Sequence, residues 1–192
     1  HNVTRTAGVF FIKTIYSVLV SLFCLIANQP FPFIPIQITL VDACIEAYPS
    51  FLTILEADIR RIRGRFLPTA FSHALPFGAV IALMIGVISL LAPFTTGERQ
   101  TVMYLLLIIL SMAAVIKSCI PINPLRIFIC VTMVIGTFGA LLILPGLFEV
   151  QAVTASMAVY TIIAALVCLL LTFFFGKADE KKEKGIGGET AL

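Results

Sequence analysis

Charged residues are scarce in this sequence. Asp, Glu, Lys and Arg make up only 12% of the 192 residues, whereas 60% are apolar and the mean hydropathy is +1.09. A water-soluble domain keeps about a quarter of its residues charged, so a soluble globular fold is excluded. The charges are also clustered, which leaves uncharged runs at 14–41, 66–97, 100–116, 127–148 and 150–176. Runs of this length are typical of membrane-spanning helices.

Several catalytic and binding signatures are missing as well. The five cysteines have no CxxC spacing, so neither a disulfide framework nor a zinc site is indicated. Because there is no Asp-Lys-Thr-Gly-Thr phosphorylation sequence and no Gly-x-x-x-x-Gly-Lys-Ser/Thr loop, no catalytic or cofactor-binding residue is assigned. The small formal charge of +3 lies in loops and tail, and no nucleic-acid partner is expected. The chain begins at His1 without a signal-peptide layout, and we expect it to be a fragment of a longer protein.

The apolar runs predict six membrane-spanning helices. They are placed at about 7–27, 34–55, 71–92, 101–117, 126–144 and 153–175. We therefore expect an all-α, polytopic membrane protein, in which residues 1–176 form a bundle of six transmembrane helices with a broken second helix. The lipid bilayer is its expected partner. Residues 177–192 are rich in Lys and then in Gly, and we expect them to form a disordered cytoplasmic tail.

The distribution of Lys and Arg predicts the orientation in the membrane. Basic residues gather at the N-terminal side, in the 56–69 loop, in the 117–126 turn and in the tail, whereas the alternate loops contain Arg99 alone. Cytoplasmic loops have an excess of Lys and Arg, so both termini are expected in the cytoplasm of a multi-pass plasma-membrane protein. Lys13 lies near a span boundary, where it can reach the inner interface or sit on a helix that extends into the cytosol.

Two carboxylates in the second predicted span are the most informative feature. Asp42 and Glu46 are four residues apart, so on a helix both side chains lie on one face. Near the bilayer midplane each acid costs about 2.5–3.5 kcal/mol to insert, and the two repel each other. We therefore expect a cation or protons to neutralise them. Pro49 cannot donate a hydrogen bond to the carbonyl group four residues earlier, which frees carbonyl oxygens near Glu46.

Further oxygen donors precede the carboxylates in the same span. Gln37 and Thr39 lie on the approach to them, and a set of oxygen ligands suits hard cations such as Ca²⁺, Mg²⁺, Mn²⁺, Na⁺ or protons. Cys44 has no second Cys or His nearby, which favours a packing role over a soft-metal site. The structural alternative is that one carboxyl group is protonated, hydrogen-bonded to a neighbouring helix and without a role in transport.

The run from Pro35 to Pro49, Pro-Ile-Gln-Ile-Thr-Leu-Val-Asp-Ala-Cys-Ile-Glu-Ala-Tyr-Pro, resembles the sixth membrane helix of P-type cation-transporting ATPases. In that helix an Asn or Asp is followed four residues later by Asp and three residues after that by Pro. The layout of the chain is similar to the C-terminal membrane half of this family, its fifth to tenth helices, and most of all to bacterial calcium-pump-like members. The resemblance implies that Asp42 and Glu46 ligate the cation. It also implies that Thr14 and Ser17 stand where animal calcium pumps commonly have Asn and Glu.

The function implied by this resemblance is cation translocation in an ATP-driven pump. Ca²⁺ is the expected ion, with Mg²⁺ or Mn²⁺ as alternatives. ATP and its Mg²⁺ would bind only to the missing N-terminal half, which would supply the phosphorylation and nucleotide-binding domains, so these 192 residues alone are not expected to hydrolyse ATP.

Two other functions remain open at this point. A small secondary transporter coupled to protons or sodium is one alternative, although the predicted spans in 101–175 contain no carboxylate and so do not repeat the Asp42 to Pro49 segment, as inverted repeats would. A membrane scaffold without transport activity is the other, and it would leave the paired carboxylates unexplained.

Overall fold

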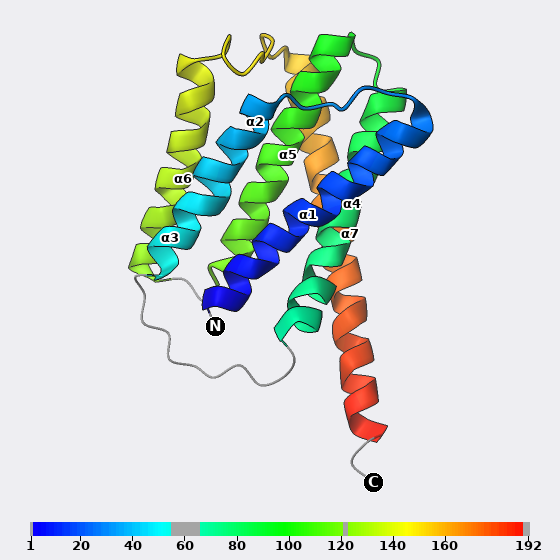
Figure 1. The fold of residues 1–192 in the computed structure, drawn as a ribbon, viewed down its shortest axis with the longest axis vertical. Coiled ribbons are helices and arrows are strands. Elements are labelled where there is room, and N and C mark those ends of the chain that lie inside the picture. The colour runs from blue at the N-terminus through cyan, green and yellow to red at the C-terminus, as the bar shows by residue number, and fades with distance from the viewer. Residues whose placement is uncertain (1, 55–65, 121–122, 190–192) are drawn as a thin grey trace.

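The computed structural model describes residues 2–54, 66–120 and 123–189, and within these ranges it contains helices and no strand (Figure 1). The helices are α1 (Asn2–Ala27), α2 (Pro35–Leu40), the π-helix η1 (Val41–Ala47), α3 (Tyr48–Ile54), α4 (Phe66–Leu91), α5 (Thr96–Ser118), α6 (Pro124–Ile143) and α7 (Ala155–Glu189). Among them, α1, α4, α5, α6 and α7 are long and apolar enough to cross a membrane. The expected all-α, polytopic membrane fold is confirmed.

The second predicted span consists of three consecutive helical segments, α2, η1 and α3. The expected break in this helix takes the form of a π-helix, in which the chain stays helical but is wound more widely. The N–H group of Tyr48 accordingly donates to the carbonyl oxygen of Ala43, five residues earlier. Pro49 follows directly and has no N–H group to donate. Single π-helical turns occur frequently at functional sites, and this one contains both Asp42 and Glu46.

Short-range sequence signals explain the sharp turn between α1 and α2. Asn28 adopts a positive φ of 51°, a left-handed conformation that Asn tolerates better than most residues. Pro30 and Pro32 then prevent the helix from continuing. Pro35 begins α2 at the first helical position, where its missing N–H group would have no helical partner.

The helices alternate in direction through the bundle. In Figure 1 the loops 28–34, 92–95 and 144–154 lie at the upper end. The first residues of α1 and the last residues of α7 both lie at the lower end. The two ends of the chain therefore emerge on the same side, as six crossings require. Of the basic loop 56–69, which contributed to the predicted orientation, residues 56–65 lie outside the described residues, as do positions 121–122.

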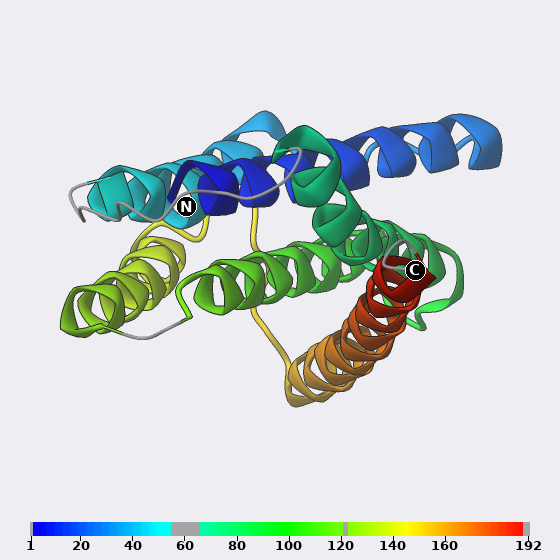
Figure 2. The same ribbon diagram turned by 90° about the horizontal axis from the view of Figure 1, so that it is seen from below.

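Helix α5 forms the centre of the bundle. In α5, 67% of the residues are buried, whereas only 17% of the residues in the apolar stretch Phe10–Ala27 of α1 are buried. Figure 2 shows α5 between a layer formed by α1, α2 and α3 on one side and α7 on the other. Large apolar side chains on the outer helices are highly exposed, such as Ile26 at 85% and Leu142 at 81%. Surfaces of this kind fit a hydrocarbon environment, which agrees with the expected lipid bilayer.

Helix α7 continues to Glu189 and so enters the segment expected to form a disordered tail. Residues 178–184 are Ala, Asp, Glu and Lys, most of which are strong helix formers, and this explains the helical continuation. The disorder of residues 177–192 stays a prediction.

Candidate cation site between α1 and the π-helix

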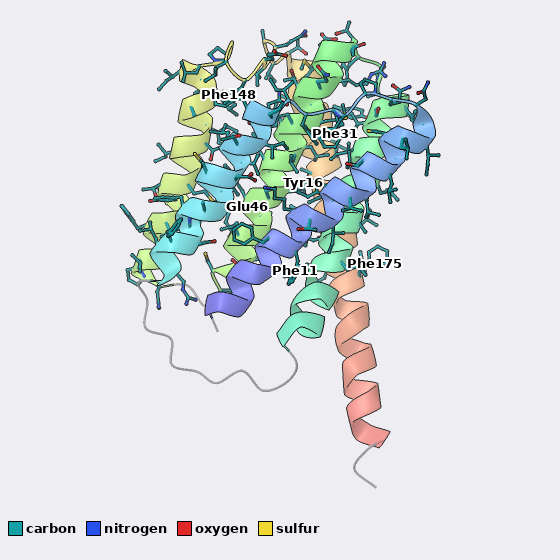
Figure 3. All side chains as sticks on the ribbon, in the orientation of Figure 1. Phe11, Tyr16, Phe31, Glu46, Phe148 and Phe175 are labelled. Atoms are coloured by element: carbon teal, nitrogen blue, oxygen red, sulfur yellow. The ribbon has the colours of Figure 1, made fainter. Side chains whose placement is uncertain are left out.

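The π-helix places the two predicted carboxylates against α1. η1 packs against α1, α5 and α6, so its side chains lie among three other helices. Glu46 is fully enclosed, with 2% of its surface exposed. Figure 3 labels Glu46 and Tyr16 of α1, and both lie near the middle of the bundle's height. Glu46 therefore lies far from either end of the bundle.

Asp42 forms an ion pair that the sequence analysis missed. The Nζ atom of Lys13, on α1, donates a hydrogen bond of 2.5 Å to Oδ1 of Asp42. Lys13 was expected to reach the inner interface or to lie on a cytosolic extension, and the structure shows its ammonium group bonded to Asp42. A charged side chain inside a bundle is stabilised by an opposite charge, and a neighbouring helix provides one here. The signal in the sequence was a lone Lys in an apolar run, next to a span that contains lone acids.

Glu46 and Tyr16 both have a buried oxygen atom without a hydrogen-bond partner. Among the described residues, neither Oε2 of Glu46 nor the Tyr16 hydroxyl group meets a bonding atom. The Ser17 side chain interacts with the Tyr16 hydroxyl group, but not at hydrogen-bond geometry. Leaving a buried polar group unpaired costs about 1–3 kcal/mol, and more for a charged group. The α1–η1 interface thus has bonding capacity that the described protein groups do not use.

These side chains form one electrostatic cluster. Tyr16 lies within electrostatic reach of both carboxylates. Glu46 in turn lies within reach of Lys13 and Asp42. One ammonium group and two carboxylates therefore share the interface between α1 and η1. The cluster combines a closed ion pair with a second carboxyl group that has unused bonding capacity.

Gln37, a predicted ligand, is occupied by other bonds. Its Oε1 atom accepts a hydrogen bond of 3.2 Å from the backbone N–H of Ile34, and its Nε2 atom donates one of 2.8 Å to the carbonyl oxygen of Phe148. Its own carbonyl oxygen accepts a 3.1 Å hydrogen bond from the Tyr104 hydroxyl group. Gln37 therefore joins the start of α2 to α5 and to the loop after α6.

The predicted hydroxyl ligands are divided by the structure. Thr39 and Thr14 are exposed, and each donates to a carbonyl oxygen of its own helix, that of Pro35 at 2.9 Å and that of Phe10 at 3.0 Å. Ser17, in contrast, is half-buried and directly follows Tyr16 on α1. The structure thus brings Asp42 and Glu46 together and adds Lys13 and Tyr16. The side chains of Gln37, Thr14 and Thr39 instead form hydrogen bonds with backbone groups outside the cluster.

The cluster has too few carboxylates for an all-acid metal site. Within the described parts of the chain, no three His, Cys, Asp or Glu side chains come together as metal ligands. A bound cation would need further oxygen atoms, for which the Tyr16 and Ser17 hydroxyl groups and the carbonyl groups before Pro49 are the nearest chemical candidates. Tyr16 is recognisable in retrospect, since it follows Lys13 by three residues and so shares its helix face.

Neighbouring helices hold η1 in place from the side away from α1. Just after the π-helix, the Tyr48 hydroxyl group shares a 2.7 Å hydrogen bond with the Thr132 hydroxyl group of α6. Just before it, the bond from Tyr104 anchors α2 to α5. The π-helix is therefore fixed at both ends, which gives its acids a defined position opposite α1.

Comparison with known proteins gives three similar sequences. No family model and no solved structure matches the chain. It is 29% identical over 168 residues, or 80% of the chain, to the probable cation-transporting ATPase exp7 of Streptococcus pneumoniae. It is 36% identical over 92 residues, or 43% of the chain, to the calcium-transporting ATPase CtpE of Mycobacterium bovis and of Mycobacterium tuberculosis. The chain spans 22% of the first relative and 12% of the other two. With its helical membrane fold, the chain thus resembles the membrane part of bacterial P-type cation-transporting ATPases, over a fraction of their length.

Proposed function

We propose that this chain is the cation-translocating membrane part of an ATP-driven P-type ion pump. The observation behind the proposal is the buried Glu46 carboxyl group on a π-helix, with an unpartnered oxygen atom opposite the unpartnered hydroxyl group of Tyr16. Acids inside a membrane bundle commonly mark ion pathways, because they are too costly to retain without a partner. The similarity to cation-transporting ATPases agrees with this function.

Energy for transport would come from polypeptide outside these 192 residues. The sequence contains no phosphorylation motif and no nucleotide-binding loop. ATP and its Mg²⁺ would therefore bind to an N-terminal half, whose movements would open and close the cation site. That half and the lipid bilayer would be the partners of the chain.

Ca²⁺ is the ion we propose for the site. Ca²⁺ accepts six to eight oxygen ligands at about 2.3–2.6 Å in flexible geometry, whereas Mg²⁺ demands a near-ideal octahedron. The mixed set of Asp42 and Glu46 carboxylates, hydroxyl groups and freed carbonyl groups suits the more flexible ion. The relative CtpE is named a calcium-transporting ATPase. Asp42 and Glu46 are the proposed main ligands and Ser17 is a proposed hydroxyl ligand, whereas Gln37, Thr39 and Thr14 would need to change partners.

The proposed location is the plasma membrane, with both termini in the cytoplasm. The fold brings the two ends of the chain to the same side, and the excess of Lys and Arg on that side supports a cytoplasmic position. Reporter fusions after Leu192 and at Gly97 should give cytoplasmic and external signals, respectively. An external signal after Leu192 would contradict this orientation.

Proton- or sodium-coupled secondary transport is the second candidate. Lys13 pairs with one of the two acids, so Glu46 is left as the carboxyl group that would exchange a proton or bind a monovalent ion. Uptake of Ca²⁺ or another solute by vesicles that contain only this chain, driven by a proton or sodium gradient without ATP, would favour this candidate over the pump.

The proposed function is tested by removing the charge of Glu46. In a pump assembled with its N-terminal half in lipid vesicles, Glu46→Gln should lower ATP-driven Ca²⁺ uptake by about 100-fold, because losing a buried charged partner costs about 2–5 kcal/mol. Glu149→Gln is the matched control, since Glu149 is an exposed acid in the loop before α7, and it should leave uptake unchanged. Wild-type uptake by Glu46→Gln would refute the proposed role.

A further inference from the structure

Facing side chains of α1 and η1 form two pairs at this interface. Lys13 and Tyr16 are three residues apart and share one face of α1, while Asp42 and Glu46 lie about one turn apart on η1. The first pair, Lys13 and Asp42, is closed by a hydrogen-bonded ion pair. The second pair, Tyr16 and Glu46, has an unpartnered oxygen atom on each side. The same interface thus contains one pair of side chains that is hydrogen-bonded and one pair whose oxygen atoms could still bind a cation.

The ammonium group of Lys13 resembles a bound cation in its chemistry. It is a compact positive charge with three donors, at the end of a flexible four-carbon stem. Its side chain is 28% exposed and that of Asp42 is 38% exposed, so the pair lies at the edge of the interface and has room to separate. A cation that uses the carboxylates of both Asp42 and Glu46 has to displace Nζ of Lys13 from Oδ1 of Asp42.

We infer that Lys13 is a tethered counter-cation that competes with the transported cation for Asp42. The inference rests on the proposed function and adds a specificity-determining residue to it. When no cation is bound, Lys13 holds Asp42 in an ion pair and avoids an isolated charge in the membrane. When a cation binds, Lys13 must leave, and the work of separating the ion pair lowers the affinity of the site. Lys13 therefore sets how tightly the site binds, without contacting the cation itself.

A double-mutant cycle of Ca²⁺ binding tests this competition. Equilibrium dialysis with Ca²⁺ would compare the full chain in lipid nanodiscs with Lys13→Met, Asp42→Asn and the double variant. Lys13→Met should tighten Ca²⁺ binding by about tenfold, which corresponds to removing a competitor worth about 1.4 kcal/mol. In the Asp42→Asn background the same change should have no effect, because the carboxylate for which Lys13 competes is gone.

Two additional variants serve as controls for charge and for folding. Lys117→Met removes a different lysine, which lies over the Phe77 ring at 5.8 Å, and should not alter Ca²⁺ affinity. Lys13→Arg keeps the charge and should weaken Ca²⁺ binding, since a guanidinium group can pair with a carboxylate through two parallel hydrogen bonds. Lys13→Arg therefore tests the competition even if Lys13→Met does not fold.

The outcomes separate this inference from the proposed function. Ca²⁺ binding that Glu46→Gln abolishes but Lys13→Met does not tighten would overturn the competition and leave the cation site intact. Tightening of equal size in the Asp42→Asn background would overturn it too, because the effect would then be general electrostatics. If neither the wild-type chain nor any Lys13 variant binds Ca²⁺, the proposed Ca²⁺ site and the competition both fall.

Discussion

The α1–η1 interface differs from the buried threonines of α6 and α7 in how its buried polar groups are paired. In α6 and α7 each buried threonine donates to a carbonyl oxygen of its own helix at 2.8–2.9 Å, as in Thr137 to Met133, Thr161 to Met157 and Thr172 to Leu169. Between α1 and η1, the polar groups either bond across two helices, as Lys13 and Asp42 do, or have no partner, as with Tyr16 and Glu46.

This difference indicates which part of the bundle is structural and which part depends on a guest. A hydroxyl group bonded within its own helix is satisfied whatever lies next to it, so the buried threonines of α6 and α7 keep their bonds when neighbouring helices move. A bond between two helices is lost when they separate, and an unpartnered buried group is stabilised only when something binds to it. Substitutions should therefore have large and context-dependent effects between α1 and η1, and small effects in α6 and α7.

The largest expected change in stability follows removal of the Lys13 charge. Lys13→Met leaves the Asp42 carboxylate unpaired and should lower the free energy of unfolding by about 2 kcal/mol, less than the 3–5 kcal/mol of fully buried pairs because both partners are partly exposed. The double variant Lys13→Met/Asp42→Asn should recover most of that loss. Unfolding can be followed by steric trapping in lipid bicelles. A double variant as unstable as Lys13→Met would show that the ion pair is not what connects these helices.

A smaller loss is expected when the bonds of Gln37 are removed. Gln37→Leu leaves the Ile34 N–H group and the Phe148 carbonyl group without their partners, which should cost about 1–2 kcal/mol in unfolding free energy. Ca²⁺ affinity should not change if the side chain stays in these structural bonds. A selective loss of affinity without a loss of stability would instead return Gln37 to the ligand set that its position in the sequence predicted.

Hydropathy predicted the helices well because lipid imposes one strong constraint. All six predicted spans correspond to helices with ends within about five residues of the expected positions, apart from the extension of α7 beyond the apolar stretch. The break in the second helix was expected from Pro49 and the acids, but its π-helical form was not. Whether a helix unwinds or widens depends on contacts at both ends, such as the bond between Tyr48 and Thr132, and those contacts are not readable from one segment.

The sequence was enough to predict the two acids of the candidate site, but not the side chains that pair with them. Asp42 and Glu46 stand out because charge is rare in the membrane, and their spacing placed them together. Thr39 was expected as a ligand because it is an oxygen donor near the acids, and Thr14 because the family resemblance implied it. A threonine in a helix can satisfy its hydroxyl group on its own backbone, and both do so here. The pairing of Lys13 with Asp42 depends on how α1 crosses η1, which is a property of the packed bundle.

Removal of the Tyr16 hydroxyl group should stabilise the fold, unlike the substitutions of Lys13 and Gln37. Because the group is buried without a partner, Tyr16→Phe removes an unpaired oxygen and should raise the free energy of unfolding by about 1 kcal/mol in the absence of cation. In saturating Ca²⁺ the gain should shrink or reverse if the hydroxyl group helps to bind the ion, since ligand binding stabilises the folded state according to its affinity. Unfolding measured with and without Ca²⁺ would show this. A loss of stability in both conditions would mean that the hydroxyl group already has a partner.

The smallest effect is expected for the threonines that are satisfied within their own helix. Thr161→Val keeps the shape of the side chain and removes only the hydroxyl group, whose acceptor, the Met157 carbonyl oxygen, can still receive the backbone bond of α7. The change in unfolding free energy should stay within about 0.6 kcal/mol, the average for side-chain hydrogen bonds in membrane helices, and Ca²⁺ affinity should be unaffected. Steric trapping on Thr161→Val, beside Lys13→Met in the same lipid, provides the direct contrast between the two regions. A loss above about 1.5 kcal/mol would mean that the Thr161 hydroxyl group supports a contact between helices, and α7 would then share the dependence on interhelical bonds that distinguishes the α1–η1 interface.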